Sequence, residues 1–174
     1  MTVKFDLENP MTRNLYLLRH AKSSWDYPEL NDFERPLNKR GRHDIPVMAL
    51  LIKQKGFIPD RILSSPATRA AMTARTVAEI TGISEKQLVF DQAVYEAGVS
   101  DLVKVVGSTD SEVRNLMLVG HNPGLTAFAS FLTGHMIDNI PTSGLCGIGF
   151  NIRSWSEIGE NRGKFLFLET PKHR

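Results

Sequence analysis

The pair Arg19-His20 has the residue types most suited to chemistry in this sequence. It directly follows the apolar run Leu15–Leu18, and a buried strand seldom ends on two groups that are costly to leave unpaired. The planar guanidinium of an arginine matches phosphate oxygens, and a neutral histidine offers a nitrogen nucleophile near pH 7. The pair therefore indicates phosphoryl chemistry at the end of a strand.

A second polar junction follows the apolar run Arg61–Ser64. The next residues continue Ser-Pro-Ala-Thr-Arg, so that Ser65 can cap a helix and Pro66 suits its first position, where a missing N–H costs nothing. Arg69 then lies one turn into the helix, near its positive end. The junction predicts a second cation beside a strand end.

A third junction repeats this pattern after the run Leu116–Val119. The sequence continues Gly-His-Asn-Pro-Gly, which predicts Asn122 as the capping residue and Pro123 as the first helical residue. His121 is thereby placed between a strand and a helix N-terminus, where backbone N–H groups attract anions.

These three junctions predict one site. In an α/β sheet, ligands collect beyond the carboxyl ends of the strands, so we expect Arg19, His20, Arg69 and His121 at one edge of the sheet. Taken singly, a histidine after a strand is often structural and an arginine on a helix is often solvated. The sequence has no HExxH motif, no paired cysteines and no carboxylate next to either histidine, so we expect neither a metal nor a cofactor.

The elements that must position these residues alternate between short β-branched runs and helical patterns. Alternation of this kind predicts an α/β fold with a mostly parallel sheet, closed by a C-terminal pair of strands. A helix over 41–55 is expected to have Asp44 as the N-cap of its main part, because Pro46 fits only a first turn. The expected strands are Leu15–Leu18, Arg61–Ser64, Leu88–Phe90, Leu116–Val119, Gly147–Ile152 and Lys164–Leu168, and the other helices are Ala67–Thr81, Ser100–Val106 and Gly124–Leu132.

Composition sets milder bounds on the 174-residue chain. Its content of 41% hydrophobic and 23% charged residues is typical of a globular protein, and its net charge of +2 comes without basic runs, so nucleic acid is not an expected partner. We expect no membrane span and a cytoplasmic location. Residues 1–13 are predicted to be a tail or an extra edge element, residues 14–170 a single domain, and Pro171–Arg174 a frayed end.

The ordered set of motifs resembles that of the histidine phosphatase superfamily, also called the phosphoglycerate mutase-like fold. The segment 17–21 is similar to its Arg-His-Gly signature, with Ala21 where glycine is usual; the segments 64–74 and 119–123 are similar to its second and third blocks. The residues Arg-Pro-Leu at 35–37 and Pro-Thr-Ser-Gly at 141–144 most resemble SixA-type phosphohistidine phosphatases. The resemblance implies a three-layer α/β/α sandwich with a mostly parallel central sheet.

The resemblance also implies a role for each site residue. His20 would be the nucleophile and form a phosphohistidine intermediate, while Arg19, Arg69 and a protonated His121 would hold the phosphoryl oxygens. The surrounding positive charge should keep His20 deprotonated. The hydroxyl of Ser23 is expected to donate a hydrogen bond to the phosphate. Lys22 would add charge near the opening, unless it is simply a solvated side chain.

A general acid is the remaining part of the predicted machinery. Relatives that act on phosphate esters use a carboxylate to protonate the leaving oxygen, and Glu96 lies in the expected stretch, with an ordinary surface position as the alternative. Asp26 and Glu34 are less suited substitutes. A phosphohistidine substrate needs less help, because an imidazole is a far less basic leaving group than an alkoxide.

The favoured function is therefore a metal-independent phosphatase that hydrolyses phosphohistidine, with a phosphohistidine-bearing protein as one candidate substrate. The alternatives are a small-molecule phosphomonoesterase with the same mechanism, a mutase, and a non-catalytic module that binds phosphorylated partners. The short chain leaves little room for the long insertions that cover the site of sugar-phosphate mutases. The intact nucleophile argues against a role in binding alone.

Overall fold

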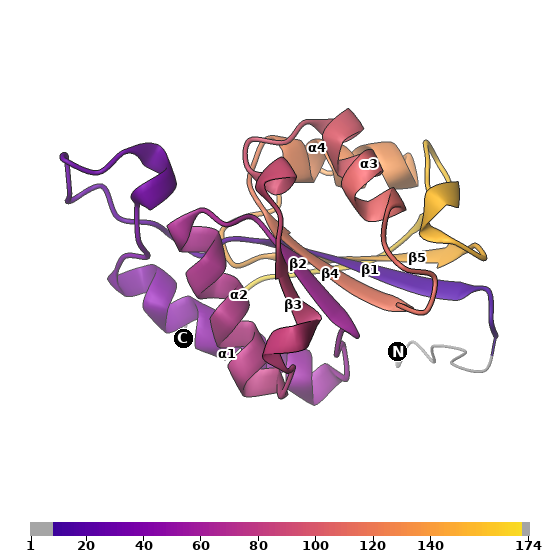
Figure 1. Ribbon diagram of the computed structural model, residues 1–174, viewed down its shortest axis with the longest axis horizontal. Helices are drawn as coiled ribbons and strands as arrows, with labels where there is room; N and C mark the ends of the chain where they lie inside the picture. Colours follow the sequence, from indigo (N-terminus) through magenta and orange to yellow (C-terminus); the bar gives the residue numbers. More distant parts are fainter. Residues whose placement is uncertain (1–8, 172–174) are drawn as a thin grey trace.

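A single mixed sheet forms the centre of the part of the chain that the computed structural model describes, residues 9–171 (Figure 1). The strand order is β3-β2-β4-β1-β5-β6. The first four of these strands are parallel; β5 pairs antiparallel with β1, and β6 pairs antiparallel with β5. The strands are β1 (Thr12–Arg19), β2 (Arg61–Ser64), β3 (Leu88–Phe90), β4 (Asn115–Gly120), β5 (Leu145–Asn151) and β6 (Lys164–Glu169). The predicted mostly parallel sheet with a C-terminal pair of strands is confirmed, and the structure shows that this pair is antiparallel.

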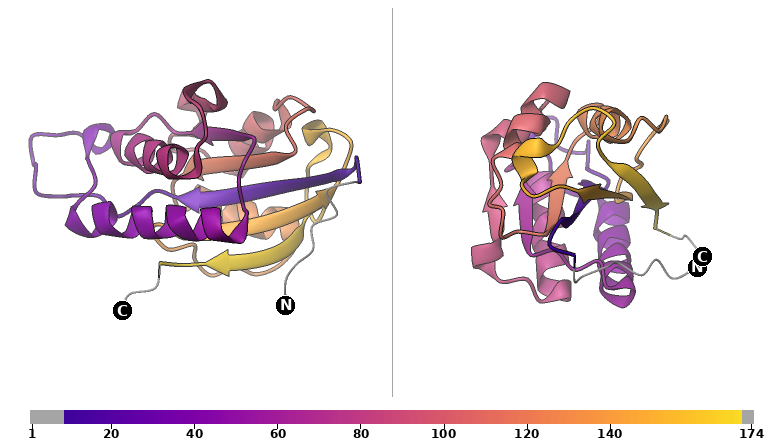
Figure 2. Two further views of the ribbon diagram at one scale, coloured as in Figure 1. Left: turned by 90° about the horizontal axis from the view of Figure 1, so that it is seen from below. Right: turned by 90° about the vertical axis from the view of Figure 1, so that its right-hand side faces the viewer.

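Two helices cover each face of this sheet, which makes the predicted three-layer α/β/α sandwich (Figures 1 and 2). Helices α1 (Lys39–Lys55) and α2 (Thr68–Thr81) lie on one face, and α3 (Val99–Gly107) and α4 (Gly124–Thr133) lie on the other. Four 3-10 helices join these elements in the described chain: η1 (Asp32–Glu34), η2 (Glu85–Gln87), η3 (Gln92–Val94) and η4 (Trp155–Glu157).

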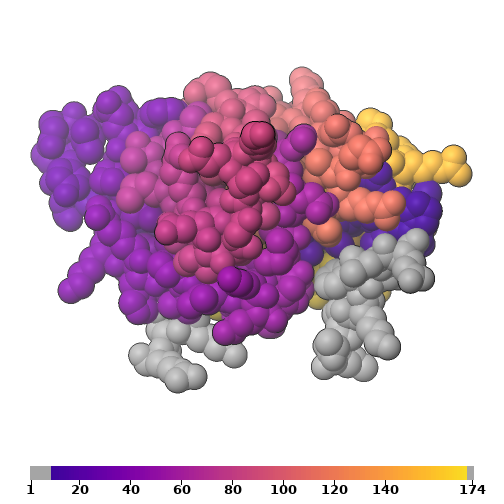
Figure 3. Space-filling model, turned by 60° about the horizontal axis from the view of Figure 1, so that its bottom comes forward, coloured from indigo at the N-terminus to yellow at the C-terminus, as the bar shows by residue number. Residues whose placement is uncertain are grey.

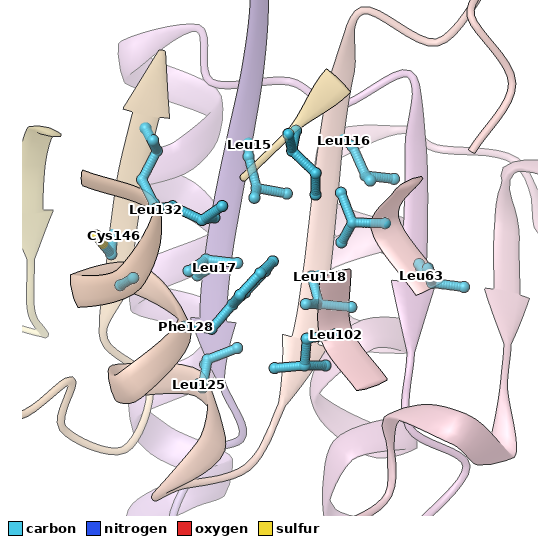
Figure 4. Close-up of a cluster of buried hydrophobic side chains, with 14 of the residues drawn as sticks. Leu15, Leu17, Leu63, Leu102, Leu116, Leu118, Leu125, Phe128, Leu132 and Cys146 are labelled. Carbon is cyan, nitrogen blue, oxygen red and sulfur yellow. The ribbon is translucent and has the colours of Figure 1, made fainter. Parts of the chain in front are cut away.

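The two faces of β1 contribute to two separate hydrophobic clusters. Leu15 and Leu17 pack with Phe128 of α4 (Figure 4), whereas Tyr16 and Leu18 belong to the cluster beneath α1 and α2. Successive side chains of a strand point to opposite faces, so a central strand covered on both sides must be apolar throughout. This explains why the run before Arg19 is uninterrupted.

Helix α1 begins earlier than the sequence pattern predicts. Its N-cap is Asn38, whose side chain accepts a hydrogen bond from the N–H of Gly41 at 2.9 Å. The prediction that Asp44 caps the helix is wrong: Asp44 is buried inside it and accepts a hydrogen bond from Arg40. The first turn forms ahead of Pro46 because it packs closely on the preceding chain, where a Cβ on Gly41 would lie 2.2 Å from the Lys22 carbonyl oxygen.

The other two predicted caps differ in detail. The N-cap position of α2 is Ala67, and the side chain of Ser65 instead accepts from the Ala67 N–H at 3.2 Å. Pro123 takes the N-cap position of α4, while the predicted capping residue, Asn122, accepts from the N–H of Thr126 at 3.2 Å. Both helices therefore start at the predicted junctions, each with a different residue in the cap position.

The ends of the chain are described in part. Strand β1 already begins at Thr12, so the last residues of the predicted 1–13 tail belong to the sheet. Arg13 is buried, and its guanidinium donates to the carbonyl oxygens of Ile152 and Ser111, at 2.7 Å each. Residues 1–8 and 172–174 of the predicted termini lie outside the described residues. None of the described helices is long and apolar enough to cross a membrane.

Candidate active site

An open cleft of about 810 Å³ lies beyond the carboxyl ends of β1, β2 and β4. Arg19 and His20 enter it from the end of β1, Arg69 from the first turn of α2, and His121 from the end of β4. The structure thus brings together four residues that are far apart in the sequence. They meet because three parallel strands with neighbouring places in the sheet all end at this edge.

His20 is held in a form suited to nucleophilic attack. Its Nδ1 lies 2.8 Å from the carbonyl oxygen of Ala21, and because a carbonyl can only accept, Nδ1 carries the hydrogen and Nε2 keeps its lone pair. Burial lowers the pKa of His20 to about 3, and the neighbouring charges of Arg69 and Arg19 act in the same direction. The imidazole is therefore neutral at pH 7, as the sequence predicts.

Arg69 turns a different edge of its guanidinium toward each neighbour. Its Nε donates to Nε2 of His20 at 3.3 Å. The two terminal nitrogens donate to Asp32, one to the backbone carbonyl at 2.6 Å and the other to the carboxylate at 3.0 Å. Asp32 thus binds the two terminal nitrogens of Arg69, while the Nε–H points to Nε2 of His20.

Asp32 is a cleft residue that the sequence analysis misses. Its carboxylate accepts hydrogen bonds from Arg69 at 3.0 Å, from Arg35 at 2.9 Å and from the Tyr95 hydroxyl at 2.8 Å. Burial acts to raise the pKa of Asp32, but the hydrogen bonds from Tyr95, Arg35 and Arg69 outweigh it and lower the pKa to about 2. The i,i+3 spacing of Asp32 and Arg35 is a sequence signal for the ion pair between them. The contacts of Asp32 with Arg69 and Tyr95 depend on the fold.

Two buried nitrogens of the cleft residues have no hydrogen-bond partner among residues 9–171. They are Nε of Arg19, whose Nη1 donates to the Ile140 carbonyl at 3.0 Å, and Nδ1 of His121, whose Nε2 lies 2.7 Å from Oγ of Ser65. Buried polar atoms are nearly always paired, so exceptions call for an explanation such as a bound ligand. An oxyanion would satisfy both atoms.

The protonation of His121 differs from the expectation. Burial lowers its pKa to about 4, and the charge of Arg69 lowers it further than the charge of Asp32 raises it. The imidazole is therefore neutral at pH 7, whereas the sequence analysis expects a protonated His121 beside phosphoryl oxygens. A neutral imidazole still has one N–H with which to donate to a phosphate oxygen.

Ser23 and Arg35 form another part of the cleft wall. The buried Ser23 hydroxyl accepts a hydrogen bond from Arg35 at 2.8 Å, which leaves its own hydrogen for a further acceptor. The guanidinium of Arg35 stacks on the ring of Trp25 at 3.6 Å from the ring centroid. Trp25 is 74% exposed and lines the cleft. The chain between β1 and α1, to which it belongs, projects from the body of the molecule (Figures 1 and 3).

Of the three carboxylates considered from the sequence, only Glu96 lines this cleft. It is exposed, and its backbone has a φ of 54° in the loop between η3 and α3. Asp26 binds the Ser24 hydroxyl at 3.0 Å, and Glu34 accepts from the Asn31 N–H in the capping box of η1. Lys22 lines the cleft with an exposed side chain. Among the described residues, no group of three or more histidine, cysteine or acidic side chains could hold a metal ion.

Comparison with known proteins identifies the family. Residues 15–118 match the model of the histidine phosphatase superfamily (branch 1). The chain belongs to this superfamily. A sequence relative, an uncharacterized chloroplastic protein of Arabidopsis thaliana, is 35% identical over 73% of this chain, and the match spans 62% of the relative's length. An uncharacterized protein of Mycobacterium leprae is 25% identical over 89% of this chain and all of its own.

Solved structures of the superfamily share the fold. A candidate phosphohistidine phosphatase, SixA, of Agrobacterium tumefaciens superposes with a TM-score of 0.77 at 28% identity, over 91% of this chain and 98% of its own. A protein histidine phosphatase SixA bound to tungstate has a TM-score of 0.78 at 19% identity, over 91% and 97% of the two chains. The family assignment and the structural similarity therefore agree on the fold of this chain.

Proposed function

We propose that this protein is a phosphatase in which Nε2 of His20 attacks phosphorus, and that phosphohistidine is its substrate class. One observation carries the proposal: a neutral, buried His20 keeps a lone pair on Nε2, to which Nε of Arg69 donates at 3.3 Å, in a cleft that Arg19 and His121 also line. These cationic and N–H donors suit the charge that develops on the equatorial phosphoryl oxygens. The reaction needs no metal for this purpose.

The reaction has two steps. In the first, Nε2 of His20 bonds to phosphorus while the bond from phosphorus to the leaving atom breaks, and the leaving group takes up a proton. The Ala21 carbonyl stays bound to Nδ1–H and stabilises the positive charge on the phosphorylated ring. In the second step water attacks phosphorus and the bond to Nε2 breaks. One proton of the water passes to solvent, which replaces the proton taken up by the leaving group, and inorganic phosphate leaves with the other.

The carboxylates of the cleft favour a leaving group that needs little protonation. Asp32 is held as a carboxylate by two arginines and a tyrosine, with its pKa lowered to about 2, so it cannot donate a proton near pH 7. Glu96 remains, and it is exposed at the cleft. Imidazole leaves more readily than an alkoxide, because the pKa of a free histidine is about 6.5. This supports a P–N bond as the bond that is cleaved.

The shape of the cleft supports a large substrate. Its volume of about 810 Å³ exceeds what a phosphoryl group needs, and the exposed Trp25 is one of the residues that line it. A phosphohistidine carried by a protein could reach His20 through such an opening. The similarity to the SixA structure from Agrobacterium tumefaciens is consistent with this substrate class.

A second candidate is the hydrolysis of small phosphomonoesters, favoured by the position of Glu96 in the cleft. A carboxyl there could protonate an alkoxide as it leaves and later take the proton back from the attacking water.

A comparison of substrates with the His20→Ala variant tests the proposal. We expect the wild-type protein to release phosphate from a phosphohistidine peptide and from phosphoramidate faster than from sugar phosphates. The variant should lose roughly three orders of magnitude in kcat, because the covalent step has no nucleophile. The variant His43→Ala removes a histidine that is exposed on α1 and should keep full activity.

Two results would contradict parts of this proposal. Unchanged phosphate release by His20→Ala would rule out the nucleophile and the mechanism. Rapid cleavage of sugar phosphates with none of phosphohistidine would rule out the substrate class and leave the mechanism in place.

A further inference from the structure

The hydroxyl of Ser65 connects a backbone donor to His121. Ser65 is fully buried at the junction of β2 and α2, and its N–H donates to the Val119 carbonyl at 3.0 Å. Its Oγ accepts from the Ala67 N–H at 3.2 Å and lies 2.7 Å from Nε2 of His121. Within residues 9–171, Nε2 of His121 is the one acceptor that the structure gives to the Ser65 hydroxyl hydrogen.

This arrangement distinguishes the two neutral forms of His121. If Nε2 carried the hydrogen and donated it to Ser65, the serine hydrogen would be buried without an acceptor, which is costly. Nδ1 would then be a buried acceptor without a donor among the described residues. If Nδ1 carries the hydrogen, the Ser65 hydroxyl donates to Nε2. In the series of hydrogen bonds from Ala67 through Ser65 to His121, every hydrogen except Nδ1–H then has an acceptor.

The remaining hydrogen is the one that the proposed reaction uses. Nδ1 of His121 is buried and has no hydrogen-bond partner among the described residues, and His121 lines the cleft together with His20, at 5.1 Å between the two ring centroids. A phosphoryl oxygen held beside His20 would accept from Nδ1–H, whereas it would be repelled by a lone pair at the same position.

We propose that Ser65 is a positioning residue that fixes the tautomer of His121, so that its Nδ1–H donates to the phosphoryl group. The proposal rests on the phosphatase function above, because it assigns an oxyanion as the acceptor. Ser65 does not touch the substrate; it acts through the imidazole.

Ser64 provides a matched control for Ser65. It is the preceding residue, it is also fully buried, and its hydroxyl donates to a backbone carbonyl, that of Ser65, at 2.9 Å. The variants Ser65→Ala and Ser64→Ala remove the same atom from adjacent buried positions. Only the first removes the hydrogen bond to His121.

The test reads the tautomer directly, by the ¹⁵N chemical shifts of the imidazole nitrogens at pH 7. In the wild-type protein and in Ser64→Ala we expect Nδ1 of His121 to carry the hydrogen; in Ser65→Ala we expect a mixture of tautomers. Titration with inorganic phosphate should give roughly tenfold weaker binding to Ser65→Ala, as for loss of one hydrogen bond to a charged group. The variant Ser65→Thr, which keeps the hydroxyl, should retain the wild-type tautomer.

Several outcomes would overturn the proposal. One is a wild-type His121 with its hydrogen on Nε2. Another is an unchanged His121 tautomer in Ser65→Ala. If that variant only melted at a lower temperature, the role of Ser65 would be structural. Equal phosphate affinity in Ser65→Ala and Ser64→Ala would also count against it. None of these readouts needs turnover, so they remain informative if the protein cleaves no phosphohistidine.

Discussion

At the scale of single residues, His20 and His121 have different proposed roles because one imidazole is next to a hydrogen-bond acceptor and the other is next to a hydroxyl. The Ala21 carbonyl accepts from Nδ1 of His20 and so leaves a lone pair on Nε2. Oγ of Ser65 lies 2.7 Å from Nε2 of His121, and in the proposed tautomer the hydroxyl donates there and leaves a hydrogen on Nδ1. One imidazole therefore offers the cleft a nucleophile and the other offers a donor, although both are neutral at pH 7.

Glu96 is the residue whose replacement should separate the two candidate substrate classes. We expect Glu96→Gln to lower kcat for a sugar phosphate by about two orders of magnitude, because an alkoxide needs a proton as it leaves. Cleavage of phosphoramidate should change by less than about fivefold, since its leaving nitrogen is readily protonated by solvent. Steady-state kinetics on the two substrates measures the difference.

Glu34→Gln is the control for this comparison, because Glu34 lies in the capping box of η1 and does not line the cleft. An equal loss on both substrates would show that Glu96 does not act as an acid for the ester.

At the scale of elements, Asp32 joins three segments that are distant in the sequence. It lies in η1, its carboxylate binds Arg69 at the start of α2, and it accepts from Tyr95 just before the loop that carries Glu96. That loop is held against α4 by a close approach, since a Cβ on Gly124 would lie 2.0 Å from the Ala97 carbonyl oxygen. The cleft therefore depends on how these elements meet.

Replacement of Asp32 tests this connection. We expect Asp32→Asn to lower kcat/KM for phosphoramidate by roughly tenfold, because an amide is neutral and binds two guanidinium groups less strongly than a carboxylate does. Arg69 would then be held less tightly by residue 32, and its Nε–H would no longer be directed at Nε2 of His20.

The variant Asp26→Asn serves as the control, because Asp26 lies on the same projecting segment and binds the Ser24 hydroxyl. If Asp32→Asn kept the wild-type kcat/KM, Arg69 would be oriented by other contacts.

At the scale of the whole molecule, the buried His20 and the half-buried His121 should make folding stability depend on pH. Burial lowers the pKa of His20 to about 3 and that of His121 to about 4, whereas unfolded histidines titrate near 6.5. The unfolded chain therefore binds more protons below that pH. The stabilisation is fully present above about pH 6.5 and is lost as the pH falls toward the two folded values.

Urea denaturation at pH 7.5, 6 and 5 measures this dependence. We expect the free energy of unfolding to fall with acidification, by at most about 1.4 kcal/mol per pH unit for each of the two histidines. His20→Ala should show a shallower dependence over the same range. An equal free energy at pH 7.5 and pH 5, or an unchanged dependence in the variant, would contradict the assignment.

Much of the fold follows from patterns that are local in the chain. Four apolar residues before Arg19 predict a buried central strand, and Gly82 and Gly134 end α2 and α4 in the left-handed conformation that glycine adopts easily. The error over Asp44 has two causes. Asn38 caps the first turn of α1 through the Gly41 N–H, a local signal that the sequence analysis misses. The close approach of Gly41 to the Lys22 backbone is a tertiary contact.

The sequence by itself determined the family, the layered fold and the meeting of Arg19, His20, Arg69 and His121. The carboxyl ends of parallel strands lie at one edge of the sheet, so residues at those ends come close together independently of the loop conformations. Only the tertiary structure decided the state of these residues. Burial lowers the pKa of His121, the Asp32 carboxylate accepts a hydrogen bond from Arg69, and Oγ of Ser65 lies 2.7 Å from Nε2 of His121. Burial, and the donor or acceptor that lies beside a group, depend on residues that are close in space but distant in the sequence, and sequence patterns do not identify those residues.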